Sequence, residues 1–218
     1  MIIFDCNGVL VDSEPIAAAV AAEAFQRVGI NMTPEMVARY FTGRRPEDMF
    51  AEVERVAGVT LPPEFPSVVA AATLARLNQE VRAVAHVDHA LSWLRGPKCV
   101  ASSSSLDRVR VSLGTTELYR FFGRNVFSAS DMTEGKPAPD LFLHIAHRTG
   151  VAPKDCIVVE DSPAGVTAAV AAGMVAIGFV GGGHAGEDLP GKLEQAGATC
   201  VIADMRALKA EVMRLRGY

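Results

Sequence analysis

Short apolar runs alternate with helical patterns along most of the chain, and this alternation limits the possible folds more than any other feature. The runs are apolar at neighbouring positions, so both faces of each corresponding strand are expected to be buried. Strands of this kind form parallel sheets that helices cover on both faces. The sequence therefore predicts an α/β fold with a doubly wound parallel sheet. The expected strands are residues 2–4, 98–102, 156–160, 174–180 and 200–203, with a weaker candidate at 125–129.

One long segment near the N-terminus lacks this alternation. From about residue 13 to residue 85 no convincing strand occurs, and helical patterns follow one another instead. We therefore predict a core domain of residues 1–12 and 86–218 that carries an all-helical insert of residues 13–85. Helices are expected at 15–28, 34–40, 46–57 and 65–81 in the insert, and at 90–94, 106–113, 139–149, 163–172 and 205–215 in the core, where Pro139 and Pro163 are expected at the first helical position.

Charge and hydropathy exclude several classes of protein. The chain has 21 Lys and Arg residues against 25 Asp and Glu residues, a net charge of −4. This balance argues against nucleic-acid binding, which needs clustered cations. Residues 162–183 carry no charge, but they are rich in Ala and Gly and are not a membrane span. With no signal peptide and no paired cysteine motif, we expect a cytoplasmic protein that is a monomer or a weak homo-oligomer.

Polar side chains follow the predicted strands at the points where the strands end. Asp5 follows the first strand, Ser102 ends the second, and Glu160 and Asp161 close the strand at 156–160, while Lys136 lies in a later loop. In open α/β sheets, ligands bind beyond the carboxyl ends of the strands, so these groups are expected to converge. Carboxylates hold Mg²⁺, a lysine neutralises phosphate, and a further carboxylate can act as the nucleophile. The sequence therefore predicts Mg²⁺-assisted phosphoryl transfer on a small phosphorylated metabolite.

The segments around these residues resemble the motifs of the haloacid-dehalogenase superfamily of hydrolases. In order, they are FDCNGVLVDSE at 4–14, VASSS at 100–104, GKPAPD at 135–140 and VVEDSPAGV at 158–166. The resemblance covers essentially the whole chain and implies a Rossmann-like core with a helical cap inserted after the first motif. It is greatest in the branch that contains β-phosphoglucomutase-like proteins and sugar-phosphate phosphatases, and the segment 80–104 looks most similar to the 6-phosphogluconate phosphatase type.

The family resemblance implies a role for each matching residue. Asp5 would be the nucleophile, forming an aspartyl-phosphate, and also a Mg²⁺ ligand. Residue 7 would give the metal its main-chain carbonyl, and Glu160 and Asp161 would complete the metal site. Lys136 would neutralise the phosphoryl group and orient Asp5. The remaining expected contacts to substrate are Ser102, Ser103 and Ser104 from the second motif, and Gly43 and Arg44 from a polar turn of the cap.

Asn7 departs from the family pattern. Phosphatases of the family usually carry Asp at this position, which protonates the leaving oxygen and then deprotonates the attacking water. A carboxamide cannot exchange protons at neutral pH, and general acid–base catalysis contributes typically ~10²–10⁴-fold. Three explanations of Asn7 stay open. It is an engineered change that traps an intermediate or complex, a natural change in an enzyme whose substrate has a good leaving group, or a sign of a binding module that has lost catalysis. We expect a phosphatase whose activity is reduced.

Other functions fit the sequence less well. A β-phosphoglucomutase-like phosphotransferase is disfavoured because no histidine follows the first motif within 12–18. A haloacid dehalogenase would not need the carboxylate pair of the fourth motif. A catalytically impaired module that binds phosphate esters is the main alternative from another class. The segment 181–184, GGGH, lacks the spacing of a dinucleotide-binding loop, and we expect it to be a mobile surface loop.

Overall fold

A computed structural model describes residues 1–41 and 46–217. Its centre is a 6-stranded parallel sheet with the order β3-β2-β1-β4-β5-β6. In this order β1 pairs with β2 on one side and with β4 on the other, so Ile3 lies opposite Cys99 and Val158. The strands are β1 Ile2–Phe4, β2 Lys98–Ser102, β3 Val126–Ser128, β4 Ile157–Glu160, β5 Val175–Phe179 and β6 Cys200–Ile202. The prediction of a doubly wound parallel sheet is confirmed.

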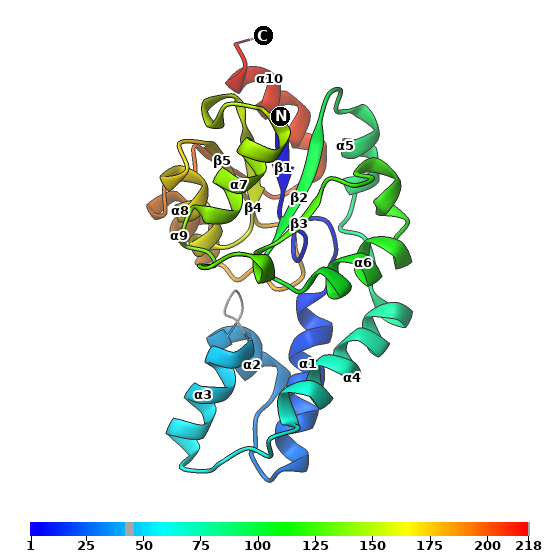
Figure 1. The fold of residues 1–218 in the computed structure, drawn as a ribbon, viewed down its shortest axis with the longest axis vertical. Coiled ribbons are helices and arrows are strands. Elements are labelled where there is room, and N and C mark those ends of the chain that lie inside the picture. Colours follow the sequence, from blue (N-terminus) through cyan, green and yellow to red (C-terminus); the bar gives the residue numbers. More distant parts are fainter. Residues whose placement is uncertain (42–45, 218) are drawn as a thin grey trace.

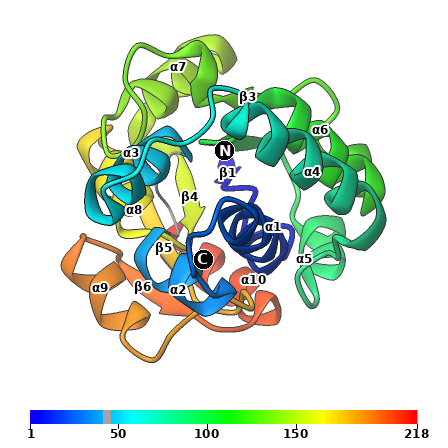
Figure 2. The ribbon, with the colours of Figure 1, turned by 90° about the horizontal axis from the view of Figure 1, so that it is seen from below.

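Helices cover both faces of the sheet because the strands are apolar on both faces. In β1, Ile2 and Phe4 belong to one hydrophobic cluster and Ile3 to another, as the alternation of side chains along a strand requires. The first cluster includes side chains of α5, α6 and α10, and the second includes side chains of α7, α8 and α9. Figure 2 shows α7, α8 and α9 on one side of the sheet and α5 and α6 on the other. These helices are α5 Val87–Trp93, α6 Leu106–Thr115, α7 Asp140–Thr149, α8 Pro163–Ala171, α9 Leu189–Gln195 and α10 Leu208–Leu215.

The segment between β1 and α5 is helical in the part that the structure describes. It contains α1 Glu14–Arg27, α2 Pro34–Phe41, α3 Pro46–Ala57 and α4 Phe65–Glu80. These helices lie below the sheet in Figure 1 and share a hydrophobic cluster that is separate from the two beside the sheet. Phe25 is at its centre, with its ring centroid 5.2 Å from Phe65 and 6.2 Å from Phe50.

Two neighbouring connections join the helical segment to the sheet. The backbone N–H of Asp12 donates to the carbonyl of Arg82 at 2.9 Å, and that of Val84 donates to the carbonyl of Leu10 at 2.9 Å. The outgoing and returning chain therefore run side by side. The division into a core of residues 1–12 and 86–218 and an insert of 13–85 stays a prediction.

Some element boundaries differ from those predicted. The helix α7 begins at Asp140, and Pro139 takes the N-cap position in place of the first helical position. The expected helix at 205–215 is a 3-10 turn, Met205–Ala207, followed by α10. The helix α9 was not predicted, because its sequence LPGKLEQ contains Pro and Gly and buries only Leu193, which leaves no helical periodicity to detect. Further 3-10 turns lie at Leu118–Phe121, Ala129–Asp131 and Pro153–Asp155.

Two expectations based on composition concern the cysteines and the membrane. All four cysteines are free thiols; Cys6, Cys99 and Cys156 are buried, and Cys200 is partly exposed. Within residues 1–41 and 46–217, no helix has the length and apolar character that crossing a bilayer requires.

Removing the ring at the centre of the helical segment tests how much that segment depends on its own core. We expect Phe25→Ala to lower the free energy of unfolding by about 3–5 kcal/mol, because Phe25 is fully buried among aromatic rings. Val56→Ala is the matched control, since Val56 is 69% exposed on α3 and its loss should change stability by less than about 0.5 kcal/mol. Urea denaturation followed by circular dichroism measures both; similar effects of the two variants would contradict the prediction.

Candidate active site

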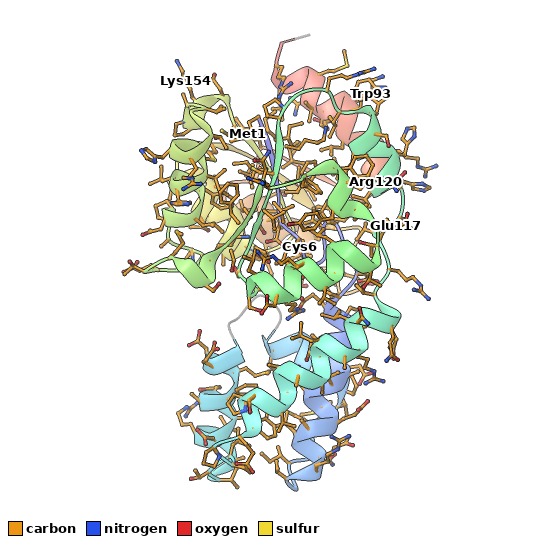
Figure 3. The ribbon with its side chains drawn as sticks, turned by 45° about the vertical axis from the view of Figure 1, so that its right-hand side comes forward. Met1, Cys6, Trp93, Glu117, Arg120 and Lys154 are labelled. Atoms are coloured by element: carbon orange, nitrogen blue, oxygen red, sulfur yellow. The ribbon has the colours of Figure 1, made fainter. Side chains whose placement is uncertain are left out.

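The predicted site residues lie at the carboxyl edge of the sheet. Asp5 follows β1 directly, Ser102 is the last residue of β2, and Glu160 is the last residue of β4. Because all strands are parallel, these ends share one edge. Cys6, the neighbour of Asp5, marks this edge in Figure 3 at the end of the sheet nearer the helical segment, while Met1 lies at the opposite end. The topology therefore brings residues from distant motifs together at the sheet edge that lies next to the helical segment.

A buried lysine joins two of these strand ends. Lys136 reaches the edge from the loop before α7, and its side chain is 5% exposed. Its Nζ donates to Asp5 Oδ1 at 2.6 Å and to the carbonyl of Ala101 at 3.1 Å, and it also forms a short hydrogen bond to Glu160 Oε1. An ammonium group has three hydrogens to donate, and all of them have an acceptor here. Lys136 is thus fixed between two carboxylates.

Burial and the neighbouring charges shift the pKa values of Lys136 and Asp5. Burial alone would lower the pKa of Lys136, but the carboxylates of Asp5 and Glu160 outweigh it and raise the pKa, so the ammonium stays charged. Burial raises the pKa of Asp5 well above its ordinary value; Lys136 opposes this, while the charges of Glu160 and Asp161 add to it. The site therefore holds more buried negative charge than Lys136 alone neutralises.

Glu160 is fully buried, and both of its carboxylate oxygens have partners. Oε1 binds Lys136, and Oε2 accepts hydrogen bonds from the backbone N–H of Ser162 at 3.2 Å and from its hydroxyl at 2.9 Å. Gly165 in α8 makes room for this carboxylate, since a Cβ built there would lie 2.0 Å from Oε1. This geometry fixes Glu160 against Lys136 and the start of α8.

Asp161 lies against the loop that follows Asp5. A Cβ on Gly8 would lie 1.9 Å from Asp161 Oδ2, and Gly8 has φ +76°, so the close approach and the backbone conformation both require glycine. The same oxygen of Asp161 is 3.0 Å from Nε2 of His184. Burial raises the pKa of Asp161 to about 6 despite the opposing hydrogen bond from His184. Burial lowers the pKa of His184, but Asp161 outweighs this effect and raises it.

Asn7 is held by hydrogen bonds at both ends of its amide. Its Nδ2 donates to Ser104 Oγ at 2.7 Å, and its Oδ1 accepts from Ser13 Oγ at 3.0 Å. Ser104 is linked in turn to Ser102, whose Oγ accepts from the Ser104 backbone N–H at 3.2 Å. Ser103, between them, is exposed. The first and second motifs are therefore joined through the amide of Asn7.

This network continues to the helical segment through Arg108. Arg108 lies on α6, and its Nη2 donates to Glu14 Oε1 at 3.1 Å and to Ser13 Oγ at 3.5 Å. Its buried Nε has no hydrogen-bond partner among the described residues. Since Glu14 is the first residue of α1, the ion pair links the sheet domain to the helical segment close to Asn7.

The donor set at this edge fits a hard divalent cation. Across residues 1–41 and 46–217 there is no group of three or more His, Cys, Asp or Glu side chains arranged to hold a metal ion. Mg²⁺ needs fewer side chains, because it is usually bound by one or two carboxylates together with waters and substrate phosphate oxygens. Asp5 and Asp161 interact electrostatically and leave negative charge unneutralised, which a cation would offset.

The structure brings most, but not all, of the predicted residues together. Asp5, Lys136, Glu160 and Asp161 form one group of interacting charges at the sheet edge. Asn7, Ser104 and Ser102 form a second, hydrogen-bonded group at the same edge. Gly43 and Arg44 lie outside the described residues.

Residues that the sequence does not assign to the site are Ser13, Arg108 and His184. The segment with His184 is expected from the sequence to be a mobile surface loop, but its histidine side chain is 5% exposed and contacts Asp161. The consecutive glycines directly before His184 are the sequence feature that could have indicated this contact, because glycine allows two backbones to approach closely.

Comparisons with known proteins agree with the motifs. Residues 1–173 match the family model described as haloacid dehalogenase-like hydrolase. The chain is 34% identical over 184 residues to a 6-phosphogluconate phosphatase of Escherichia coli, covering 84% of this chain and 83% of the relative.

Two solved structures resemble the whole chain. A haloacid dehalogenase-like protein of unknown function from Agrobacterium tumefaciens superposes with a TM-score of 0.89 at 37% identity, covering 99% of this chain and 98% of the other. A family hydrolase from Deinococcus radiodurans, solved with bound phosphate and sodium, superposes with a TM-score of 0.81 at 30% identity, covering 99% of this chain and 95% of the other.

The contact between α8 and Glu160 gives a test of the site geometry. We expect Gly165→Ala to destabilise the protein by about 1–3 kcal/mol, because the new methyl group overlaps the buried Glu160 carboxylate. Gly114→Ala is the control: Gly114 is an exposed residue of α6, and no atom lies within 4 Å of the point that a Cβ would occupy there, so alanine should be neutral or stabilise by up to about 1 kcal/mol. Thermal unfolding with calorimetry separates the two. A harmless Gly165→Ala would show that Glu160 is not fixed as described.

Proposed function

The chain belongs to the haloacid dehalogenase-like hydrolases, and on that basis we propose that it is a Mg²⁺-dependent phosphatase of small phosphorylated sugars or sugar acids. The observation that carries this proposal is the buried Lys136, which binds Asp5 and Glu160 at the sheet edge beside Asp161. A carboxylate held beside a fixed ammonium, at the edge where parallel sheets bind ligands, suits attack on a phosphate ester.

Asp5 is the proposed nucleophile. One of its oxygens attacks the phosphorus, the bond between phosphorus and the leaving oxygen breaks, and the leaving alkoxide takes up a proton from solvent water. The aspartyl-phosphate is then attacked at phosphorus by water, which loses a proton to solvent; the bond to Asp5 breaks, and inorganic phosphate forms. Lys136 favours the anionic form of Asp5 and neutralises the phosphoryl charge. Ser102 and Ser103, at the end of β2, are proposed to bind the phosphoryl oxygens, with Ser104 beside them.

Asp5 and Asp161, with the main-chain carbonyl of residue 7, are the proposed Mg²⁺ ligands. When bound, the cation would neutralise charge that develops on the phosphoryl oxygens. The family resemblance assigns Glu160 to the metal as well, but its oxygens are occupied by Lys136 and Ser162. We therefore propose that Glu160 supports the site mainly by holding Lys136.

The helical segment is proposed to act as a cap that selects the substrate. The helical segment lies next to the sheet edge that Cys6, the neighbour of Asp5, marks in Figure 3, and the Arg108–Glu14 ion pair joins the two parts. Gly43 and Arg44 remain candidate contacts to substrate. The class of substrate is supported by the 6-phosphogluconate phosphatase relative, and the Deinococcus structure carries phosphate.

A second candidate function follows from Asn7. Its amide cannot supply the proton that the leaving group needs, and both ends of the amide are already bound to Ser13 and Ser104. The same site could then bind Mg²⁺ and a phosphate ester without turning it over.

Restoring a carboxyl group at residue 7 separates the two functions. We expect Asn7→Asp to raise Mg²⁺-dependent phosphate release by at least ~10²-fold, the lower end of the contribution of general acid–base catalysis. The substitution is isosteric, and the hydroxyls of Ser13 and Ser104 can both donate to a carboxylate, so the fold should be retained. Phosphate release is measured on a panel of sugar phosphates and sugar-acid phosphates, with Mg²⁺ and with chelator.

The control is the double variant Asp5→Asn with Asn7→Asp, which should release no phosphate because the nucleophile is absent. Equal rates for the parent chain and Asn7→Asp would show that residue 7 is not the acid in this protein. Ester binding without release by either chain would favour the binding module over the phosphatase.

A further inference from the structure

We infer that His184 is a positioning residue for the cation site, holding one oxygen of Asp161 so that the other would be left to bind the cation. This inference rests on the proposed function, in which Asp161 is a Mg²⁺ ligand. The distance from Nε2 of His184 to Oδ2 of Asp161 is 3.0 Å, and the two side chains are only 5% and 8% exposed.

No other side chain among the described residues holds Asp161 in this way. Within that part of the chain its carboxylate has a hydrogen-bond partner in His184 alone, whereas Glu160 has partners at both oxygens. A hydrogen bond to one oxygen restricts the rotation of the carboxylate and leaves the other oxygen available to a cation. Outer partners of this kind commonly orient the ligands of metal sites.

The loop before the histidine is shaped to bring the imidazole to this position. A Cβ on Gly182 would lie 2.7 Å from the carbonyl oxygen of Gly8, and one on Gly183 would lie 2.6 Å from Asp12 Oδ2. The backbone N–H of Gly183 also donates to Asp12 Oδ1 at 3.1 Å. The glycines therefore allow the loop after β5 to pack directly on the loop after β1.

The imidazole itself is packed against that first loop. A Cβ on Gly8 would lie 2.5 Å from Cε1 of His184, so the ring fills the space that glycine leaves there. Its Nδ1 is buried without a hydrogen-bond partner among the described residues. Leaving a buried polar atom unpaired is costly, so hydrogen bonding at Nδ1 does not account for the burial of this histidine. The polar contact that the ring does make is to Asp161.

A positioning residue and a competing cation predict opposite effects on metal binding. If His184 positions Asp161, its removal frees the carboxylate and weakens Mg²⁺ binding, typically by ~10–100-fold for such partners. If the imidazole of His184 instead competes with the metal for the carboxylate of Asp161, its removal strengthens Mg²⁺ binding. A purely structural histidine would change stability and leave the affinity unchanged.

The test measures MgCl₂ binding without substrate by isothermal titration calorimetry on the full chain. We expect His184→Ala to raise the Mg²⁺ dissociation constant ~10–100-fold. His184→Gln, whose amide can donate a hydrogen bond, should retain part of the affinity. The control is His89→Ala, because His89 is exposed and should not affect binding.

Circular dichroism shows whether each variant is folded. If His184→Ala is unfolded, the Mg²⁺ affinity of His184→Gln is compared with that of the parent chain instead. Unchanged or tighter Mg²⁺ binding in a folded His184 variant would overturn the inference, as would a parent chain that binds no Mg²⁺. Weakened binding in His184→Ala, together with no phosphate release from Asn7→Asp, would sustain the inference while the phosphatase proposal fails.

Discussion

The ammonium of Lys136 lies inside the protein between two carboxylates, and much of the site depends on this arrangement. A buried charge is costly unless it is paired and hydrogen-bonded, and here each hydrogen of the ammonium has an acceptor on a different strand end. The group draws β1, β2 and β4 to one point at the sheet edge. The same burial leaves an excess of negative charge around Asp5, which a bound cation would offset.

Close packing of loops completes the site around this group. Gly8 lets Asp161 approach the loop after Asp5, Gly165 leaves space for Glu160, and the glycines before His184 bring a third loop into contact. Side chains at Gly8 and Gly165 would displace the carboxylates of Asp161 and Glu160, which interact with each other. The glycines of this chain thus decide how closely the charged groups can gather.

Asn7 and Arg108 connect this chemistry to the helical segment. The amide of Asn7 joins the serines of the second motif to Ser13, and Arg108 continues the chain of contacts to Glu14 at the start of α1. Residue 7 therefore has a structural role whatever its part in proton transfer. A change in the position of the helical segment would therefore shift Asn7 and the serines of the second motif through these hydrogen bonds.

The sequence by itself determined the parallel sheet, the helical segment and the group around Asp5 and Lys136, because apolar strands buried on both faces and polar residues at their ends leave a local pattern. It did not determine α9, which has no helical periodicity, or the parts played by Arg108 and His184. Arg108 and Glu14 form a contact although they are more than 90 positions apart along the chain. His184 and Asp161 lie in loops that follow different strands. Only the tertiary structure decided these, because a hydrogen bond between distant loops depends on how the strands are ordered and how closely the backbones approach, and neither leaves a periodic signal in the sequence.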